Sequence, residues 1–252
     1  MFVFTTISCT PNTTPTPVND TIIVYDTTHL RDTVCIPKCF DAVACYPFEG
    51  NANDISGNNY NGTVIGATLT TGHKGHANSA YYFNKSASTR IELPNLSTFD
   101  NAGEISISIW AKTDNVADYG TTILTVTPDV PTDRFMLNIN HSGTPLNTNI
   151  FDYGNISTGR ITSAASTPVF NTWEHYVFVK STTGNFMKIF KNGVEIASKT
   201  GGSSISNKAK KLVLGASPDS PNLLFKGSLD DLKIFNKALI STEVSNIYNT
   251  EK

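Results

Sequence analysis

The sequence has little charge and no long apolar run. Of its 252 residues, 16% are charged, and 19 Lys and Arg against 21 Asp and Glu give a net charge of -2. With no run of either sign, the chain lacks the basic surface that attracts nucleic acid or anionic lipid. Thr, Ser, Asn and Gly interrupt every hydrophobic stretch before it reaches the ~20 residues that cross a bilayer. The sequence therefore argues against a nucleic-acid partner and excludes a polytopic membrane protein.

The composition favours β-structure over helix. The chain is rich in Thr, Ser, Asn and Gly, contains many β-branched residues, and has few uninterrupted stretches of Ala, Leu, Glu and Lys. From residue 41 onward, short runs of alternating apolar and polar residues recur between turn signals. We therefore expect an all-β protein.

Four segments carry the clearest element signals. Residues 105–112 and 173–180 alternate between apolar and polar side chains, as half-buried strands do. Residues 188–197 surround an Asn-Gly pair, the favoured turn of a β-hairpin. Residues 241–248 predict one short C-terminal helix with its first Ser as the N-cap. This pattern predicts a two-sheet antiparallel β-sandwich, or jelly roll, in a single domain over residues 41–252.

Residues 1–40 are predicted to form a separate leader and flexible linker. The chain opens with a short apolar run that lacks the basic residues of a full signal peptide and continues into Thr- and Pro-rich sequence. Ile7-Ser8-Cys9 resembles the end of a bacterial lipobox, in which the Cys becomes the acylated first residue of the mature chain. We then expect an outer-membrane lipoprotein or a secreted protein of the cell envelope, with membrane contact only through a lipid anchor on Cys9. The alternative is a disordered, unmodified N-terminus.

Three further cysteines follow, an odd number that cannot all pair within one chain. The spacing of Cys35 and Cys39 predicts a disulfide that closes a small loop in an oxidising compartment. The same spacing could begin a metal site, but a zinc cluster needs more Cys or His nearby, and the closest histidine is His29. Cys45 lies in an alternating segment and is predicted to be a small buried residue.

Short motifs follow one another in a definite order after residue 41. They occupy residues 43–58, 61–63, 80–83, the Ser-Ile-Ser-Ile-Trp strand, residues 171–175, 190–193, Gly215, and 225–239 with Glu243. In this order they resemble the laminin-G-like domains of the concanavalin A-like lectin/glucanase superfamily, found in secreted bacterial proteins. The resemblance covers residues 41–252 and implies a jelly-roll fold. It implies less about activity, because one fold hosts many functions.

Asp230 is the most informative acidic residue. Simple alternation places it on one strand face with Leu232 and Ile234, and a carboxylate beside two core aliphatics needs a cation, an arginine or several backbone N–H groups. The resemblance implies a structural Ca2+ there, held by Asp230 together with oxygens from residues 49–54 or from near Gly75. The alternative is an Asp that accepts N–H groups of a turn without any metal.

Asp54 and three histidines have structural explanations beside the functional ones. Asp54 precedes a Ser-Gly pair and is predicted to organise its own turn, with metal ligation as the alternative. His175 alternates with apolar neighbours and is predicted to be structural rather than catalytic. His73 and His76 stand three residues apart without the Glu of a His-Glu-x-x-His zinc helix, so we expect a loop there.

Four side chains are candidates to contact a ligand. Trp110 lies on the strand face opposite the three Ile residues of its segment, where an exposed ring could stack on a sugar. The alternative is that residues 113–134 or 141–168 fold over that face and bury the ring. Loops on a rigid scaffold are natural ligand sites. The same segments carry the other candidates, Tyr119, His141 and Tyr153.

The sequence gives little support for catalysis. Glucanases of this architecture cleave with carboxylates spaced Glu-x-Asp-x-x-Glu, a run that this chain lacks, and its seven Glu residues are scattered singly. A Gly-x-Ser-x-Gly serine elbow is also missing. We expect a non-catalytic carbohydrate-binding or adhesion module with a glycan as partner. The first alternative is an interaction or structural protein that binds a cell-surface protein, and the second is a glycoside hydrolase with distant carboxylates that converge.

Overall fold

The structure, a computed structural model, describes ten stretches of the chain. These are residues 21–24, 34–37, 39–86, 89–95, 103–114, 122–127, 134–141, 147–202, 211–217 and 220–252. The predicted lipidation site Cys9 and the candidate ligand residue Tyr119 lie outside them.

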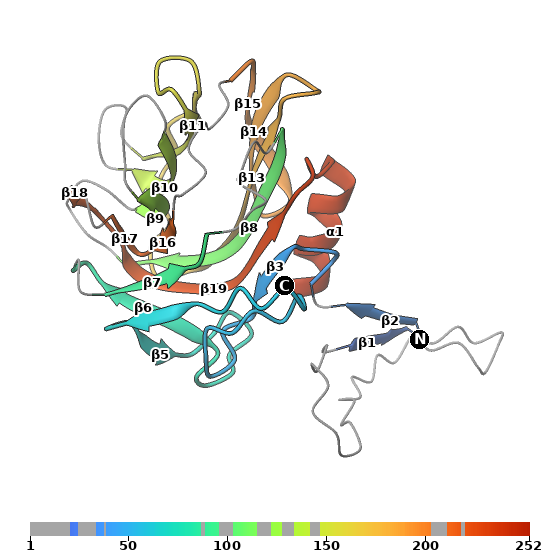
Figure 1. Cartoon of the computed structure of the whole chain (residues 1–252), viewed down its shortest axis with the longest axis vertical. Coiled ribbons are helices and arrows are strands. Elements are labelled where there is room, and N and C mark those ends of the chain that lie inside the picture. The colour runs from blue at the N-terminus through green and yellow to red at the C-terminus, as the bar shows by residue number, and fades with distance from the viewer. Residues whose placement is uncertain are drawn as a thin grey trace.

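Two antiparallel sheets pack face to face (Figure 1). The eight-stranded sheet has the order β15-β14-β13-β8-β19-β6-β5, and β3 also pairs with β19. Its strands are β3 (Ala44–Tyr46), β5 (Thr68–Thr70), β6 (Ala80–Asn84), β8 (Glu104–Thr113), β13 (Trp173–Ser181), β14 (Phe186–Lys191), β15 (Val194–Thr200) and β19 (Lys226–Phe235).

The seven-stranded sheet has the order β12-β11-β10-β9-β16-β7-β4. Its strands are β4 (Thr63–Ile65), β7 (Arg90–Leu93), β9 (Thr122–Thr127), β10 (Arg134–His141), β11 (Thr148–Gly154), β12 (Arg160–Thr162) and β16 (Lys211–Leu214). A short ribbon of β17 (Ala216–Ser217) and β18 (Ser220–Leu224) follows β16. The predicted two-sheet antiparallel sandwich is confirmed.

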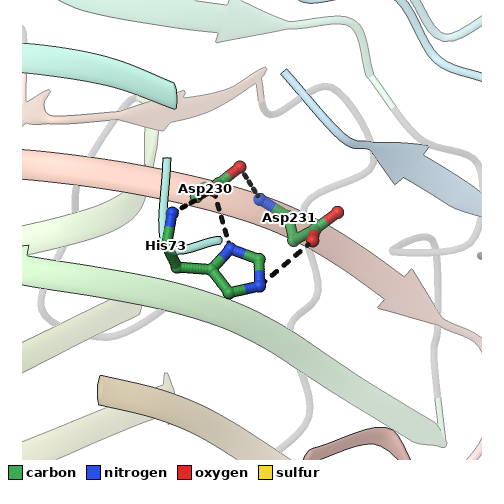
Figure 2. Close-up of side chains that lie close together, drawn as sticks. All are labelled: His73, Asp230 and Asp231. Carbon is green, nitrogen blue, oxygen red and sulfur yellow. Dashed lines mark hydrogen bonds and ion pairs between the residues drawn. The ribbon is translucent and has the colours of Figure 1, made fainter. Parts of the chain in front are cut away.

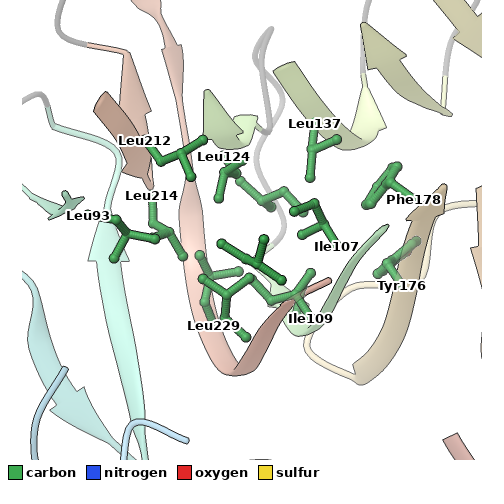
Figure 3. Close-up of a cluster of buried hydrophobic side chains, with 14 of the residues drawn as sticks. Leu93, Ile107, Ile109, Leu124, Leu137, Tyr176, Phe178, Leu212, Leu214 and Leu229 are labelled. Atoms are coloured by element: carbon green, nitrogen blue, oxygen red, sulfur yellow. The ribbon is translucent and has the colours of Figure 1, made fainter. Parts of the chain in front are cut away.

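Inward-facing side chains of both sheets form the main core (Figure 3). Ile107 and Ile109 of β8 point inward, as the alternation predicts, and meet leucines such as Leu124 and Leu137 of the facing sheet. Tyr176 of β13 lies in the same core, so the inner face of this strand is the one that carries Tyr176 and Phe178. Burial of this apolar surface, at about 25 cal/mol per Å2, is the main force that holds the two sheets together.

The hairpin of β14 and β15 turns at Asn192 and Gly193, as predicted. Both residues have positive φ, 49° and 80°. A two-residue type I′ turn requires this conformation at both central positions, and Asn and Gly adopt it at low cost.

β19 departs from simple alternation at Asp230 and Asp231. Its register against β8 shifts between Asp230 and Lys233, and Asp231 has a φ of 45°. Leu229 and Leu232 both point into the core, so the two residues between them form a bulge whose side chains face outward. The expectation that Asp230 shares a face with Leu232 is therefore wrong, because the extra residue of the bulge reverses the alternation.

The helix α1 (Ser241–Glu251) lies on the outer side of the eight-stranded sheet (Figure 1). Its Val244 and Ile247 join a second apolar cluster with Val177 and Val179 of β13 and Phe190 of β14. This cluster explains how the outer face of the sheet is covered. Among the described residues, no helix has the length and apolar character to cross a bilayer.

The start of α1 differs from the prediction. Ser241 is the first helical residue, and Ile240 is the N-cap. The carboxylate of Glu243 accepts the backbone N–H of Ile240 at 2.9 Å. A helix N-terminus leaves N–H groups unpaired, and a carboxylate three residues after the N-cap can satisfy one of them, so no Ser cap is needed.

The disulfide joins Cys39 and Cys45, whose Cα atoms are 5.7 Å apart. The prediction that Cys35 pairs with Cys39 is therefore wrong, whereas Cys45 is buried, as predicted, and is the partner of Cys39. The chain turns sharply after Cys39, where the N–H of Ala42 donates to the Cys39 carbonyl at 2.8 Å, and this turn brings β3 alongside. Sequence spacing alone could not show that turn.

Cys35 lies instead in a two-stranded ribbon of the leader. β2 (Val34–Pro37) pairs antiparallel with β1 (Thr21–Val24), and Cys35 stands opposite Ile23. The sequence analysis predicted no strands in this segment.

A test of the sheet geometry uses Gly227, which has a φ of 144° in β19. A Cβ at this position would collide with the carbonyl oxygen of Lys112 on the neighbouring strand. We expect Gly227→Ala to lower the free energy of unfolding by about 3 kcal/mol, measured by urea denaturation. The matched control is Gly50→Ala, where φ is 78° but no atom lies within 4 Å of the added Cβ. Equal losses in the two variants would contradict the steric explanation.

Candidate functional site

The bulge of β19 places a group of ionisable side chains on the outer face of the eight-stranded sheet. His73, Asp230 and Asp231 lie close together there (Figure 2), with their ligand-type atoms within 4.8 Å of one another. His73 comes from the turn between β5 and β6. Its side chain and that of Asp230 are each only 4% exposed.

Both oxygens of the Asp230 carboxylate accept N–H donors. Oδ2 accepts the backbone N–H of His73 at 2.9 Å and lies 2.7 Å from the Nδ1 of the same residue (Figure 2). Oδ1 accepts the backbone N–H of Asp231 at 2.8 Å. The carboxylate is thus held by the turn that precedes β6, which is one of the compensations that its burial requires.

His73 also reaches the end of α1. Its Nε2 lies 3.0 Å from the carbonyl oxygen of Glu251 and 3.7 Å from the Oδ2 of Asp231. The ring stacks on Trp110 with 4.4 Å between the ring centroids and 10° between the planes. One imidazole therefore connects the turn after β5 with strands β8 and β19 and with the helix.

A cation, Lys233, lies in the same buried region. Its Nζ is 2.6 Å from the Oε1 of Glu251 and 3.5 Å from the Oδ1 of Asp231. Burial alone would lower the pKa of Lys233, but the negative charges of Asp231 and Glu251 outweigh it and raise that pKa. The Nε1 of Trp110 donates to the Oε2 of Glu251 at 2.8 Å. Glu251 is therefore the anchor of the last turn of α1.

The donors around Asp230 do not fit Ca2+. This ion takes six to eight oxygen ligands. Around Asp230 the structure places N–H groups and an imidazole, and the ammonium of Lys233 stands beside Asp231. The calcium ion implied by the resemblance stays a prediction that this arrangement does not support.

Asp54 organises its own turn, as predicted. Its Oδ1 accepts the N–H groups of Cys45 and Ser56, each at 2.9 Å, and its Oδ2 accepts the N–H of Tyr60 at 3.0 Å. The N–H of Gly75 donates to the Gly72 carbonyl at 3.0 Å within the turn that carries His73. Asp54 is not part of the group of ligand-type side chains around Asp230.

Trp110 is 5% exposed, so the prediction that its ring stacks on a ligand is wrong. Burial was the stated alternative, but the side chains stacked on the ring belong to other segments than expected, namely His73 and Tyr248 of α1. The outer face that alternation assigns to Trp110 is correct. The ring is covered because α1 packs over this face and places Tyr248 against Trp110.

Tyr153 is fully buried, and the prediction that it contacts a ligand is also wrong. Its ring packs edge-on against Phe135 and Phe151 in the core. In β11 the positions 151 and 153 face inward, whereas positions 150 and 152 face outward. Because side chains alternate along a strand, a core position for Phe151 predicts an inward Tyr153 and an outward Asp152.

The outer face of the seven-stranded sheet carries a buried carboxylate with arginines around it. Asp152 of β11 is fully buried, and Arg160 of β12 donates to both of its oxygens, from Nε and from Nη2, each at 2.6 Å. The Nη1 of Arg134 lies 3.7 Å from the Oδ2 of Asp152. The side chain of Arg160 remains 37% exposed and that of Arg134 17% exposed. The sequence analysis missed all three residues.

His141 lies beside this group at the end of β10, paired with Thr148. Burial lowers the pKa of His141, and the positive charge of Arg160 lowers it further, while Asp152 acts in the opposite direction. The Nδ1 of His141 has no hydrogen-bond partner in the part of the chain that the structure describes. Of the three predicted ligand residues within the described stretches, Trp110, His141 and Tyr153, it is His141 that the structure places at a polar, partly exposed surface.

This chain matches the model of a known protein family. The family model of the concanavalin A-like lectin/glucanases superfamily matches residues 85–245. No curated protein matches the chain.

Several solved structures share the fold. Domain 4 of AbnA, a GH43 extracellular arabinanase from Geobacillus stearothermophilus solved in complex with arabinotriose, is 21% identical with a TM-score of 0.65, over 82% of this chain and 98% of that domain. The binding domain of Paraclostridial Mosquitocidal Protein 1 is 18% identical and that of botulinum neurotoxin serotype G 17%, each with a TM-score of 0.60 over 83% of this chain. The alignments cover 52% and 51% of these toxin domains, so this chain spans about half their length. At these identities the likeness concerns the fold alone.

The role of Glu251 can be tested by removing its carboxylate. Glu251→Ala leaves the fully buried Lys233 with Asp231 as its nearest anion, and we expect a loss of about 3 kcal/mol in unfolding free energy. Chemical denaturation measures the loss, and hydrogen exchange reports on the amides of α1. Asn249→Ala, an exposed position in the same turn, is the control and should change stability by less than about 0.5 kcal/mol. A mild effect at Glu251 would show that the helix end is not anchored by charge.

The second test concerns His175, whose pKa is lowered from 6.5 to about 3, first by burial and then by the positive charge of Lys233. Because the folded state favours the neutral ring, its contribution to stability is complete above pH 6.5 and declines as pH falls toward 3. Between pH 6.5 and 5 we expect it to lose about 2 kcal/mol.

The measurement compares this chain with His175→Phe, which keeps a ring against Trp110 and Tyr248 but cannot titrate. The stability difference between the two proteins, from urea denaturation at both pH values, should shift by about 2 kcal/mol in favour of the variant at pH 5. If the stabilities of the two proteins changed in parallel with pH, the pKa of His175 would not be lowered in the folded state.

Proposed function

Because this chain belongs to the concanavalin A-like lectin/glucanase superfamily, we propose that it is a non-catalytic carbohydrate-binding module of a bacterial cell-envelope protein. The fold that it shares with an arabinotriose-bound domain supports a sugar ligand, and the fold shared with toxin binding domains supports a binding role more generally. The observation that carries the proposal is the polar group of Arg134, His141, Asp152 and Arg160 on one outer face of the sandwich.

The two outer faces of the sandwich offer different surfaces. On the eight-stranded sheet, α1 covers β13 and β14, and His73 covers Trp110. On the seven-stranded sheet, Arg160 and Arg134 keep part of their side chains accessible, and His141 is half-buried. We therefore assign the ligand to the seven-stranded side, at β10 to β12.

The chemistry of this group suits sugar hydroxyls. Arg160 is fixed by two charge-assisted bonds to Asp152, which orients its guanidinium before any ligand arrives. The Nδ1 of His141 is buried, so Nε2 is the ring nitrogen left for a ligand, and in the neutral ring it donates or accepts according to the tautomer. Sites of this kind bind by a few well-placed polar groups that fix the orientation of the ligand.

The placement of the acids supports a non-catalytic role. The chain lacks the Glu-x-Asp-x-x-Glu run of the glucanases. Asp230, Asp231 and Glu251 do gather, but each is 3% exposed. Asp231 and Glu251 face Lys233, and Asp230 accepts the backbone N–H groups of His73 and Asp231. Asp152 is fully buried and bonded to Arg160, so it is not available as a general base.

The proposal includes anchoring at the envelope. Acylation of Cys9 would attach the module to a membrane and leave the segment up to residue 40 as the spacer to the sandwich. The alternative partner, a cell-surface protein, would use the same exposed side chains.

The glycan proposal is tested on an array of neutral and acidic glycans, followed by calorimetry on the best ligand. We expect His141→Ala to raise the dissociation constant at least about tenfold, because the variant removes a hydrogen-bonding ring beside Arg160. His76→Ala, which changes an exposed histidine in the turn before β6, should leave binding unchanged.

Three results would redirect the proposal. A blank array would favour a protein partner. Equal affinity of the His141 and His76 variants would move the site away from β10. Release of reducing ends from a polysaccharide, abolished by one Asp or Glu substitution, would favour a glycoside hydrolase.

A further inference from the structure

The side chains around β12 offer a ligand many hydrogen-bond donors and few acceptors. The side chain of Arg160 is 37% exposed. Lys199 of β15 reaches the same strand, where its Nζ donates to the carbonyl oxygens of Thr158 at 2.8 Å and of Arg160 at 3.0 Å. Guanidinium and ammonium groups donate but cannot accept. The carboxylate between the strands, Asp152, is fully buried and has both oxygens bonded to Arg160, so it does not accept from a ligand.

This balance of donors and acceptors separates two classes of glycan. A neutral sugar presents hydroxyl groups that both donate and accept, so it is best matched by a site with exposed donors and acceptors. The carboxylate of a uronate sugar only accepts, and its negative charge strengthens bonds from guanidinium and ammonium groups. Building on the proposed function, we propose that the glycan bound at β10 to β12 is acidic, and that its carboxylates bind to Arg160 and Lys199.

Arg160 has one edge left for such a carboxylate. Of the five N–H groups of a guanidinium, one on Nε and one on Nη2 bond to Asp152. The remaining N–H groups lie on Nη1 and Nη2 and have no acceptor in the stretches that the structure describes. One N–H from each of these two nitrogens forms a fork that fits both oxygens of a carboxylate. The bonds to Asp152 hold this fork in place before the ligand arrives.

The charges described at this edge of the sandwich are mostly positive. Asp152 faces two guanidinium groups, because the Nη1 of Arg134 lies 3.7 Å from its Oδ2 in addition to the bonds from Arg160. Lys199 bonds to carbonyl oxygens and meets no carboxylate among the described residues. Its charge is therefore available to attract an anionic group, whereas a neutral sugar would gain nothing from it.

The first test is calorimetry of the full chain with uronate oligosaccharides and their methyl esters. The panel holds oligomers of galacturonate, of mannuronate and of hyaluronan, and each ester keeps the sugar skeleton but lacks the charge. We expect at least one acid to bind, and its ester to bind at least about tenfold more weakly, because the ester loses the charge-assisted bonds. Dextran sulfate, a polyanion without carboxylates, should bind more weakly than the best uronate.

Three results would overturn the inference. One is equal affinity for an acid and its ester, and another is binding of neutral glycans alone. Both would leave the proposed function standing, because a sugar still binds. The third is dextran sulfate that binds as tightly as the best uronate, because charge rather than a carboxylate would then be recognised. If neither acidic nor neutral glycans bind, the proposed function fails, and this inference fails with it.

The second test removes the charge of Lys199. Lys199→Gln keeps N–H donors, and we expect it to lower the affinity for the acid about fivefold and to leave the affinity for the ester unchanged. Lys188→Gln is the matched control: it removes a charge from the neighbouring strand β14, where Lys188 lies 2.8 Å from Glu195, and should leave both affinities unchanged.

The comparison of the two variants has clear contrary outcomes. Unchanged affinity of Lys199→Gln for the acid, or equal losses in both variants, would overturn the assignment of the carboxylate to Lys199. If Lys199→Gln does not fold, the salt dependence of the parent decides. An affinity for the acid that falls clearly between about 50 and 500 mM NaCl supports the role of charge, and a constant affinity overturns it.

Discussion

The burial of two adjacent carboxylates on β19 is the constraint on which the outer half of the molecule depends. The bulge turns Asp230 and Asp231 to the same face of the sheet, where water could have solvated them. Instead the turn after β5 and the helix α1 cover them, and each brings a polar group to the cluster, His73 from the turn and the carboxylate of Glu251 from the helix. Because removal of one partner leaves a buried charge unpaired, the turn, the strand and the helix must dock together.

This docking covers much of one outer face of the sandwich, which is why we propose the ligand site on the other. A helix that packs on β13 and β14, and a histidine stacked on Trp110, cover the central part of the outer face of the eight-stranded sheet. The seven-stranded sheet uses its buried acid differently, because the arginines that pair with Asp152 retain exposed surface. Compensation of a buried carboxylate therefore covers part of the outer face of the eight-stranded sheet. On the seven-stranded sheet the same requirement leaves a polar surface.

The sequence predicted the sandwich because period-two alternation is a local property, visible in β8 and in the Asn-Gly hairpin. It did not predict the bulge at Asp231, since one extra residue reverses the face of every later side chain without changing composition. The disulfide partner of Cys39 and the burial of Trp110 were missed for another reason: both depend on contacts between segments distant in the chain. His141 was a candidate because the sequence pattern suggested a long connecting segment from residue 141, although it is the last residue of β10. Arg160 matches no motif, because its role depends on its contact with Asp152.

Asp152 also bears on how a binding surface can remain stable. A guanidinium held by two bonds of 2.6 Å has already lost most of its rotamer freedom in the free protein. A ligand that bonds to the remaining donors then pays little for ordering that side chain, so more of the interaction energy contributes to affinity. The same pair fastens the short strand β12 to β11, because Asp152 stands opposite Arg160 in the sheet register. In the proposed function, folding and recognition would draw on this one ion pair, and a substitution at Arg160 would alter both. A substitution at His141 separates the two effects better.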